Sequence, residues 1–342
     1  MVSEDIFPDD YYKYDKLKYK RFLDRFSEDI RSAYSQQIRH IVADIRVKDT
    51  SRVVFCGMGG SAIAAMVMKN YIDPSEFHFE VVNDYEIPGK LGLDDLVIIC
   101  SYSGNTEEAM SCYKQVRREG SQLIIISSGG KLFDAVSNGR VPFIRLIKDY
   151  PPRAALSYMF FILLKLFEEV GVISSKSEDV RQLLDHLHRQ SLDSFAINLS
   201  GKLYGKIPLI YSSSAFYSVA YRWKTQVNEN AKSVAYSNFF PELDHNELIG
   251  FGNKNAIFHV VMLTNDEDSA RMRKRMKLSK DLLQKRDVDV TELHLKGNKL
   301  VKIFNAVLAG DLTTYYLALR YRTDPTPVDD IEQLKRNMGP YI

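Results

Sequence analysis

The sequence predicts an α/β protein with two doubly wound, Rossmann-like domains, each built on a parallel sheet, and an N-terminal helix. Short runs of valine, isoleucine and leucine alternate with stretches of helical periodicity, as in parallel sheets covered by helices on both faces. The chain has 342 residues, and a prior of roughly 150 residues per domain favours two domains. The segments VVFCGMGGSAIAAMVMK and PLIYSSSAFYSVAYRWK also align as strand, small-residue turn and helix, which indicates a weak internal duplication.

Residues 1–48 are expected to form an N-terminal helical segment. Between Lys16 and Ile45, apolar residues recur at near-helical spacing, among them Phe22, Phe26 and Ile30. This spacing predicts one long helix with a charged outer face.

The first sheet is predicted within residues 49–172. Five short apolar runs there, separated by polar or glycine-containing stretches, are typical of buried strands. The predicted strands are Arg52–Cys56, Phe77–Asn83, Asp95–Ser101, Gln122–Ser127 and Val141–Ile147. The helices expected with them are Ser61–Tyr71, Thr106–Arg118 and Ala154–Val170.

The second domain, predicted for residues 173–342, repeats this plan. The polar stretch Gly171–Asp179 lacks periodicity and is the expected linker. The predicted strands are Ile207–Ser213, Ser233–Phe239, Ala256–Leu263 and Val288–Leu295. The expected helices are one that runs through His186, then Phe216–Lys232, Ser269–Arg286, Val301–Arg322 and Val328–Asn337.

The composition is that of an ordinary globular protein, which we expect to be cytoplasmic. Its 46 basic residues balance 44 acidic ones, so the chain as a whole is not expected to bind nucleic acid or an anionic membrane. The N-terminus has no apolar stretch behind a basic start, and no run approaches the ~18 apolar residues of a membrane span. Cys56, Cys100 and Cys112 favour buried thiols over a disulfide framework or a cysteine-based zinc site.

Two loops that follow predicted strands form the candidate ligand site. In open parallel sheets a ligand binds beyond the carboxyl ends of the strands. Gly57–Ser61 follows the first strand and Ser101–Glu108 follows the third, and both combine small residues and hydroxyls ahead of a helix. Helix N-termini favour anions, and hydroxyl and amide donors add hydrogen bonds. The second loop has no lysine or arginine, which suits a sugar phosphate better than a nucleoside triphosphate.

Two other interpretations of these loops stay open. The glycines and serines could simply form tight turns, with Ser61 and Thr106 as helix N-caps. The segment Gly57–Ala62 also fits the G-x-G-x-x-A dinucleotide fingerprint, with Asp84 placed to bind a ribose. That interpretation would make the chain an NAD(P)-binding oxidoreductase, but it gives no role to the second loop.

The loop sequences CGMGGSA and SYSGNTEE resemble the sugar isomerase (SIS) domain of phosphosugar isomerases, aminosugar synthases and sugar-phosphate-sensing regulators. Three further segments are more specific, namely PPRAAL at Pro151–Leu156, QVNENAK at Gln226–Lys232 and ELDHNEL at Glu242–Leu248. With them, nearly the whole chain resembles the bifunctional phosphoglucose/phosphomannose isomerase family, mostly from archaea. The resemblance implies two SIS-type domains that interconvert glucose 6-phosphate, and mannose 6-phosphate as well, with fructose 6-phosphate in carbohydrate metabolism. It implies no cofactor and no metal.

The resemblance also implies roles for individual residues. Glu229 would be the catalytic base, and Arg153 would lie near the reacting carbons. His245 would open the sugar ring from the neighbouring subunit of a homodimer, and Lys335 is the best match to a further site lysine near the C-terminus. The phosphate would be held by the two loops. The residues expected to hold it are Gly59, Gly60, Ser61, Ser101, Ser103 and Thr106.

Isomerisation of an aldose to a ketose needs residues of these types. The reaction moves a proton between C1 and C2 through a cis-enediol(ate), and one positioned carboxylate such as Glu229 can serve both carbons. A cation such as Arg153 can stabilise the developing oxyanion. A histidine suits ring opening because its unperturbed pKa lies near neutrality. Taken alone, each residue also has a plain structural explanation, such as a solvated glutamate on a helix surface.

A non-catalytic sugar-phosphate-binding protein is the remaining alternative. A sensing regulator would use the same loops, but such proteins usually carry a DNA-binding helix-turn-helix domain, and only one long helix is predicted before the first strand. An aminosugar synthase would need an amide-hydrolysing domain with a nucleophilic cysteine, for which the predicted organisation leaves no room. Use of mannose 6-phosphate depends on pocket shape, for which Thr326 is a candidate.

Overall fold

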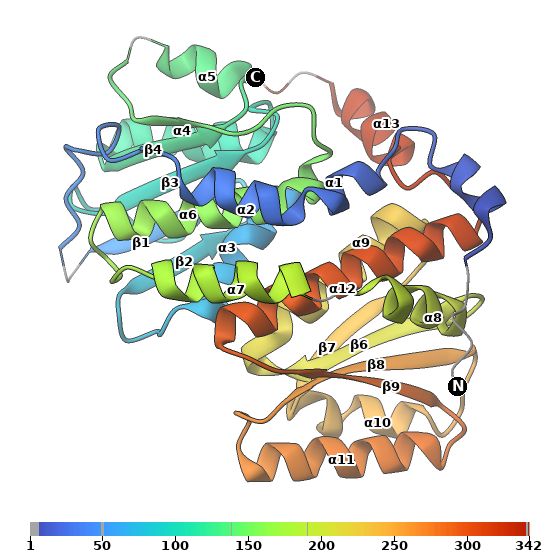
Figure 1. Cartoon of the computed structure of the whole chain (residues 1–342). Helices are drawn as coiled ribbons and strands as arrows, with labels where there is room; N and C mark the ends of the chain where they lie inside the picture. Colours follow the sequence, from blue (N-terminus) through green and yellow to red (C-terminus); the bar gives the residue numbers. More distant parts are fainter. Residues whose placement is uncertain (1–6, 49–50, 138, 190, 340, 342) are drawn as a thin grey trace. The chain divides into compact units, whose positions relative to one another are not determined.

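The computed structural model describes residues 7–48, 51–137, 139–189, 191–339 and 341. Their packing divides the chain into two compact units. The first-sheet unit contains residues 25–178 and Tyr341, and the second-sheet unit contains residues 7–24 and 179–339. Each unit has one parallel sheet flanked by helices, which confirms the predicted fold class (Figure 1). The domain boundaries predicted after residues 48 and 172 stay predictions.

The first sheet has the strand order β2-β1-β3-β4-β5, and every neighbouring pair is parallel. Its strands are β1 (Arg52–Cys56), β2 (His78–Val82), β3 (Leu96–Ser101), β4 (Gln122–Ser127) and β5 (Phe143–Arg145). The central strand β3 is buried along its whole length, which explains its uninterrupted apolar run.

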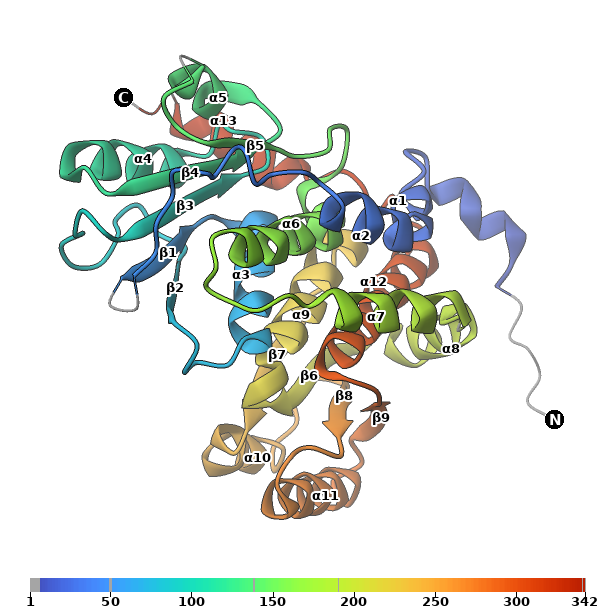
Figure 2. The same cartoon turned by 60° about the vertical axis from the view of Figure 1, so that its left-hand side comes forward.

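Helices flank this sheet in two layers (Figures 1 and 2). One face packs against α4 (Glu107–Glu119) and α5 (Gly130–Val136). On the other side α3 (Gly59–Tyr71) contacts the strands, α6 (Leu156–Glu169) packs on α3, and α2 (Phe26–Tyr34) packs on α6. A short helical turn, η2 (Pro152–Ala155), leads into α6.

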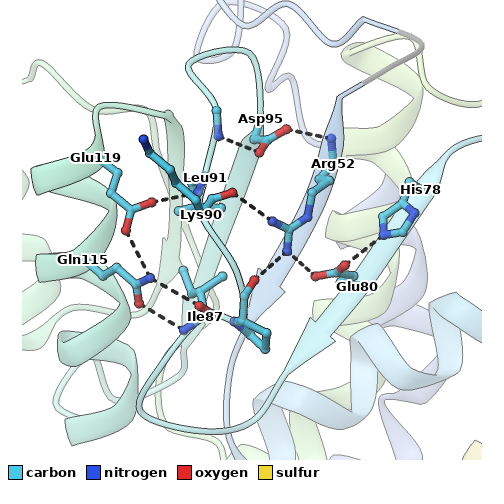
Figure 3. A network of polar contacts seen from close by, with 11 residues as sticks. Arg52, His78, Glu80, Ile87, Lys90, Leu91, Asp95, Gln115 and Glu119 are labelled. Carbon is cyan, nitrogen blue, oxygen red and sulfur yellow. Dashed lines mark hydrogen bonds and ion pairs between the residues drawn. The ribbon is translucent and has the colours of Figure 1, made fainter.

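The connection from β2 to β3 crosses β1 without a helix, and polar side chains hold it in place (Figure 3). The Arg52 guanidinium donates to the carbonyl of Pro88 at 3.0 Å, and the backbone N–H of Arg52 donates to Asp95 at 2.9 Å. Gln115 of α4 accepts from the N–H of Ile87 at 3.0 Å and donates to its carbonyl at 3.3 Å. These side chains satisfy backbone groups that a helix would pair internally.

The second sheet has the order β7-β6-β8-β9 and is also parallel throughout. Its strands are β6 (Ile207–Ser213), β7 (Tyr236–Phe240), β8 (Phe258–Asn265) and β9 (Asp289–Leu295). The helices α9 (Tyr217–Ala231), α12 (Lys299–Arg320) and α8 (Asp193–Leu203) form one layer, and η4 (Glu242–His245), α10 (Glu247–Gly250) and α11 (Ala270–Gln284) form the other. The remaining elements are η1 (Asp9–Tyr14), α1 (Lys20–Asp24), α7 (Ser177–Arg189), η3 (Ser214–Phe216) and α13 (Asp329–Met338). Among the described residues, no helix is both long and apolar enough to cross a bilayer.

A buried ion pair joins α9 to α12. Arg222 donates from Nη2 to Asp311 Oδ2 at 2.7 Å and from Nε to Oδ1 at 3.1 Å. The Arg222 side chain is 1% exposed and that of Asp311 4%, so water screens the pair very little. Trp223, the only tryptophan of the chain, lies beside Arg222 and donates to the carbonyl of Ala306 at 2.8 Å. Its indole packs where a Cβ on Gly310 would collide with it. Helix α9 is therefore fixed along its buried face.

The helical segment ahead of the first sheet is shorter than predicted. Helix α1 ends at Asp24 and α2 ends at Tyr34, and residues 35–45 form turns instead of continuing one long helix. Ile38, Val42 and Ile45 are nevertheless buried in these turns. The spacing of apolar residues shows which side chains face the core. It does not distinguish a helix from a series of turns that buries the same side chains, so the long helix was predicted wrongly.

Candidate functional site

The two predicted loops meet at the carboxyl edge of the first sheet. Strands β1 and β3 are parallel neighbours, so their carboxyl ends lie side by side. The hydroxyl of Ser61, at the start of α3, accepts a hydrogen bond from the backbone N–H of Tyr102 at 3.1 Å. Ser61 is only 4% exposed, so this bond ties the first loop to the second in a protected position.

The second loop folds around its own hydroxyl groups. Ser101 Oγ accepts from the N–H of Gly104 at 3.1 Å and lies 2.8 Å from Thr106 Oγ1. Thr106 occupies the N-cap position of α4, but its hydroxyl caps no N–H of that helix within the described chain. The exposed Ser103 accepts from the N–H of Asn105 at 3.2 Å. The N-terminal amides of α4 and this hydroxyl cluster together suit an anion.

A third loop, Ser127–Gly130 after β4, supports the second one and was not anticipated from the sequence. A Cβ on Gly104, where φ is +70°, would collide with the carbonyl of Gly129. The hydroxyl of Ser128 donates to the carbonyl of Tyr102 at 2.7 Å. The run Ser-Ser-Gly-Gly directly after a buried strand is the signal that could have identified this loop.

Arg153 is brought to the first loop by a close backbone contact. A Cβ on Gly60 would lie 2.8 Å from the carbonyl carbon of Pro152 and 2.9 Å from the backbone nitrogen of Arg153. Only glycine therefore allows η2 to cross the loop at this distance. The Arg153 side chain is 3% exposed, so the charge is enclosed in the same unit as the hydroxyl cluster. The structure thus brings the backbone of Arg153 against Gly60, in the same unit as the other five expected phosphate-binding residues.

Glu229 lies near the C-terminal end of α9 in the second-sheet unit and is half-buried. Lys232 follows the helix in the left-handed conformation, at φ 52°, and its ammonium donates to the carbonyls of Glu229 and, at 3.2 Å, Pro325. Asn228 also closes this end by donating to the carbonyl of Ser233 at 2.8 Å. The segment QVNENAK is therefore the end of α9 and its cap. Lys232 is a cation near Glu229 that the sequence interpretation did not single out.

His245 is the last residue of η4 and is exposed. Its neighbours anchor the turn, since Leu243 is fully buried and Asp244 accepts from Arg275 at 2.9 Å and from Ser279 at 2.7 Å. The segment ELDH thus fixes its backbone while the imidazole stays accessible.

Lys335 lies on α13, in the second-sheet unit with Glu229 and His245. It is exposed and donates to Glu332 at 2.7 Å, one turn earlier on the same helix. Such a pair contributes little to stability. Thr326, the candidate for shaping the pocket, precedes this helix, and its N–H donates to Asp324 at 2.9 Å.

The geometry of the polar groups favours a phosphate site over a dinucleotide site. Among the described residues, no group of three or more histidine, cysteine, aspartate or glutamate side chains could hold a metal ion. Asp84, the expected ribose ligand of a dinucleotide site, accepts from the N–H of Tyr85 at 2.6 Å in its own turn. The hydroxyl cluster of the second loop, in contrast, is suited to a phosphate.

Comparison with known proteins gives matches in both halves of the chain. A family model described as "SIS domain" matches residues 46–131, and one described as "Bacterial phospho-glucose isomerase C-terminal SIS domain" matches residues 193–338. The bifunctional phosphoglucose/phosphomannose isomerase of Caldicellulosiruptor bescii is 36% identical over 327 residues, which cover 91% of this chain and 96% of that protein. The protein of the same name from Aquifex aeolicus is 33% identical, covering 84% of this chain and 90% of its own length.

A solved structure shows a similar fold. A hypothetical protein of Thermus thermophilus superimposes with a TM-score of 0.74, covering 97% of each chain, at 14% sequence identity. At that identity the likeness concerns the fold alone.

Proposed function

The chain belongs to the bifunctional phosphoglucose/phosphomannose isomerase family, and from this premise we propose that it interconverts glucose 6-phosphate and mannose 6-phosphate with fructose 6-phosphate. The observation that carries the proposal is the set of hydroxyl and amide donors at the carboxyl edge of the first sheet, together with the buried Arg153, whose backbone meets Gly60 of the first loop. The two activities named in the family belong to the relatives, and for this chain they are our proposal.

The phosphate of the substrate would bind to the first-sheet unit. Ser61, Ser101, Ser103 and Thr106 supply hydroxyls, and the turn at Gly59 and Gly60 supplies backbone amides. Neutral donors at two helix N-termini can stabilise a dianion without a paired lysine. The substrate would thus be held by its phosphate, which is the same in all three hexose phosphates and lies away from the reacting carbons C1 and C2.

The proton transfer would be carried out by Glu229. Its carboxylate would remove a proton from C1 or C2 and return it to the other carbon through a cis-enediol(ate), a role typically worth ~10²–10⁴ in rate. Arg153 would stabilise the charge on the enediolate oxygen.

His245 would open the sugar ring, and we propose that it does so in the active site of a second copy of the chain, as part of a homodimer. The exposure of the ring and the anchored backbone of η4 support this role, because a residue that serves a partner must be accessible and well placed. Lys335 is proposed as a further site residue on the basis of family resemblance. We also propose that the protein acts in the cytoplasm without a cofactor.

Mannose 6-phosphate differs from glucose 6-phosphate only in configuration at C2. Its use requires rotation about the C2–C3 bond, so that either face of the enediolate can be protonated at C2. We propose that the pocket permits this rotation and that Thr326 contributes to its shape.

A coupled assay tests the proposal. Purified protein is incubated with fructose 6-phosphate, and glucose 6-phosphate and mannose 6-phosphate are measured separately, with and without EDTA. Formation of both products that is unaffected by EDTA is expected. Binding of fructose 6-phosphate without turnover would instead indicate a sensing protein. Nicotinamide-dependent oxidation of the sugar would support the dinucleotide alternative.

A further inference from the structure

Asp29 is a buried carboxylate that none of the proposed catalytic steps uses. It lies on α2, and its residue is 0% exposed. Oδ1 accepts from the hydroxyl of Tyr150 at 3.0 Å and lies 3.7 Å from Nε of Arg25. Within the described chain, Oδ2 has no hydrogen-bond partner. Burial raises the pKa of this carboxyl to about 6, while the bond from Tyr150 and the charge of Arg25 act against the rise. A carboxylate kept in such surroundings needs a structural or functional reason.

Tyr150 connects Asp29 to the second phosphate loop. Its backbone N–H donates to the hydroxyl of Tyr102 at 2.9 Å. Tyr102 belongs to that loop, is 8% exposed, and donates from its own N–H to Ser61 at 3.1 Å. A continuous series of hydrogen bonds therefore runs from Asp29 through Tyr150 and Tyr102 to Ser61, all within the first-sheet unit.

The segment that this series holds is the one that carries Arg153. Asp149, just before Tyr150, adopts φ 66°, a left-handed conformation that is unfavourable for a residue other than glycine. Pro151 and Pro152 then stiffen the chain up to Arg153. Gly60 approaches the backbone of Pro152 and Arg153 from the first loop. The segment is therefore held at two places. Hydrogen bonds to Asp29 and Tyr102 hold Tyr150, and the contact with Gly60 holds the backbone of Pro152 and Arg153. Together they fix a strained turn that would otherwise relax.

We propose that Tyr150 is a positioning residue for the isomerase, and that it fixes Arg153 beside the phosphate loops by bridging Asp29 and Tyr102. This inference rests on the proposed function, because it assigns Arg153 to the developing charge. Tyr150 itself need not touch the substrate. Its loss would therefore affect transition-state stabilisation more than phosphate binding.

The Tyr150→Phe variant removes the hydroxyl that reaches Asp29 and keeps both the ring and the N–H bond to Tyr102. We expect kcat to fall about tenfold, since a hydrogen bond to a charged group is of that order, while KM for fructose 6-phosphate changes less than twofold. The matched control is Tyr34→Phe. Tyr34 is also on α2, and its hydroxyl donates to another carboxylate, Glu168, at 2.8 Å. This control removes the same type of bond without touching the segment of Arg153.

The pH dependence separates positioning from a loss of stability. The groups that face Asp29 are Arg25 at the N-cap of α2, Glu28 on α2, Tyr150 and Tyr102 on the loop segments, and Tyr158 on α6. Above about pH 6 Asp29 is ionised and the bond from Tyr150 is charge-assisted, and below it the bond weakens. In Asp29→Asn an acceptor oxygen remains but the charge does not. The ratio of wild-type to Asp29→Asn kcat should therefore be largest above pH 7 and decline toward one below pH 6. Titration of the substrate phosphate is common to both proteins and cancels in this ratio.

Hydrogen–deuterium exchange of the peptide covering residues 149–155 gives a readout that does not require turnover. Faster exchange in Tyr150→Phe than in both wild type and Tyr34→Phe, with the selective fall in kcat, would support the inference. Unchanged exchange and kcat would overturn it, and so would a rise in KM at constant kcat, which would assign the bridge to phosphate binding. If the wild type showed no isomerase activity, the proposed function would fail, and unchanged exchange in Tyr150→Phe would still decide against the bridge.

Discussion

The phosphate-binding edge of the first sheet and the proposed proton-transfer residues of the second-sheet unit are built in opposite ways. Ser61, Ser101 and Arg153 are each less than 5% exposed, and the two serines bond to the loops around them. Glu229 is half-buried at a helix end, and His245 is exposed on a short turn. In our proposal, the phosphate of each substrate would thus bind to an edge that the protein's own hydrogen bonds have already formed. The two residues that we propose to move protons lie at the ends of their elements, where one side chain is half-buried and the other exposed.

The strand–turn–helix units that open the two sheets show the same contrast. After β1 the turn is glycine-rich and α3 begins at Gly59, so backbone amides are available to a ligand. After β6 the turn is serine-rich and forms η3 before α9 begins at Tyr217. Ser212 and Ser213 are buried there, and the hydroxyl of Ser212 has no hydrogen-bond partner within the described residues. In the first repeat the turn itself offers groups to a ligand, whereas in the second repeat the candidate residue, Glu229, lies on the helix α9.

The largest effect is expected from Glu229→Gln, which tests whether the second-sheet unit supplies the base. We expect kcat to fall by ~10²–10⁴, with the Kd for fructose 6-phosphate nearly unchanged, because the phosphate donors are untouched. The control is Glu169→Gln, which removes a partly buried carboxylate that pairs with Lys165 at 2.8 Å on α6. Steady-state kinetics and calorimetric binding measure the two quantities. A variant with wild-type kcat would remove Glu229 from the mechanism.

The next largest effect is a loss of stability when the ion pair between Arg222 and Asp311, which fixes α9, is broken. Asp311→Ala leaves Arg222 buried without its carboxylate, and such losses typically cost about 3–5 kcal/mol of stability. Urea unfolding followed by the fluorescence of Trp223 reports on the second-sheet unit specifically, since it is the only tryptophan. The double variant Arg222→Met, Asp311→Leu should recover most of the loss. An unchanged midpoint in Asp311→Ala would show that the pair does not hold the helix of Glu229.

A smaller loss of stability in the same unit is expected at acidic pH. Burial lowers the pKa of His259 to about 4, with Lys206 and Lys202 lowering it further and Asp289 opposing them. Because the folded pKa lies below the unfolded value of 6.5, the stabilisation is complete above pH 6.5 and is lost as pH falls toward 4. The loss is about 3 kcal/mol for the second-sheet unit.

Trp223 fluorescence in urea at pH 7.5 and pH 4.5 measures this loss. His259→Gln should flatten the dependence, and the exposed His188→Gln should leave it as in wild type. Equal slopes in both variants would refute the role of His259.

The smallest effects are expected from alanine variants of two neighbouring glycines, Gly59 and Gly60, at the proposed phosphate-binding edge. Gly60→Ala forces a Cβ against the backbone of Pro152 and Arg153, and overpacking of this kind costs about 1–3 kcal/mol. Gly59→Ala meets open space, so only its φ of +48° is unfavourable, at about 1 kcal/mol. Calorimetry with inorganic phosphate should show weaker binding in Gly60→Ala than in Gly59→Ala. The reverse order would contradict the described contact between the first loop and η2.

Much of the fold could be predicted because buried parallel strands leave a plain signal. The run Ile207–Ser213 was predicted with the observed ends, and Arg52–Cys56 likewise, since both strands are buried on both faces after their first residue. The shorter β5 was predicted too long, and α5 and α8 were not predicted. Periodicity alone also could not show that the helix before the first sheet stops at Tyr34.

The two loops that we propose to bind phosphate could be located for a similar reason, because glycines and hydroxyls at strand ends have a local signature. The bridge through Tyr150 was not, since Asp29 lies 121 residues away in sequence and only the fold brings the two together. The support from Ser128 to Tyr102 depends on the same kind of tertiary contact. Identification of Glu229 and His245 came from family resemblance, because a helix glutamate and an exposed histidine carry no chemical signature of their own.

The most direct test of the central claim follows solvent hydrogen during turnover. Fructose 6-phosphate is incubated in D₂O with wild type and with Glu229→Gln, and the products are examined by proton NMR. Transfer through an enediol(ate) by an exchangeable carboxylate predicts deuterium at C2 of glucose 6-phosphate and mannose 6-phosphate, formed far more slowly by the variant. Products that contain no solvent deuterium after many turnovers, or equal rates in the two proteins, would contradict proton transfer by Glu229.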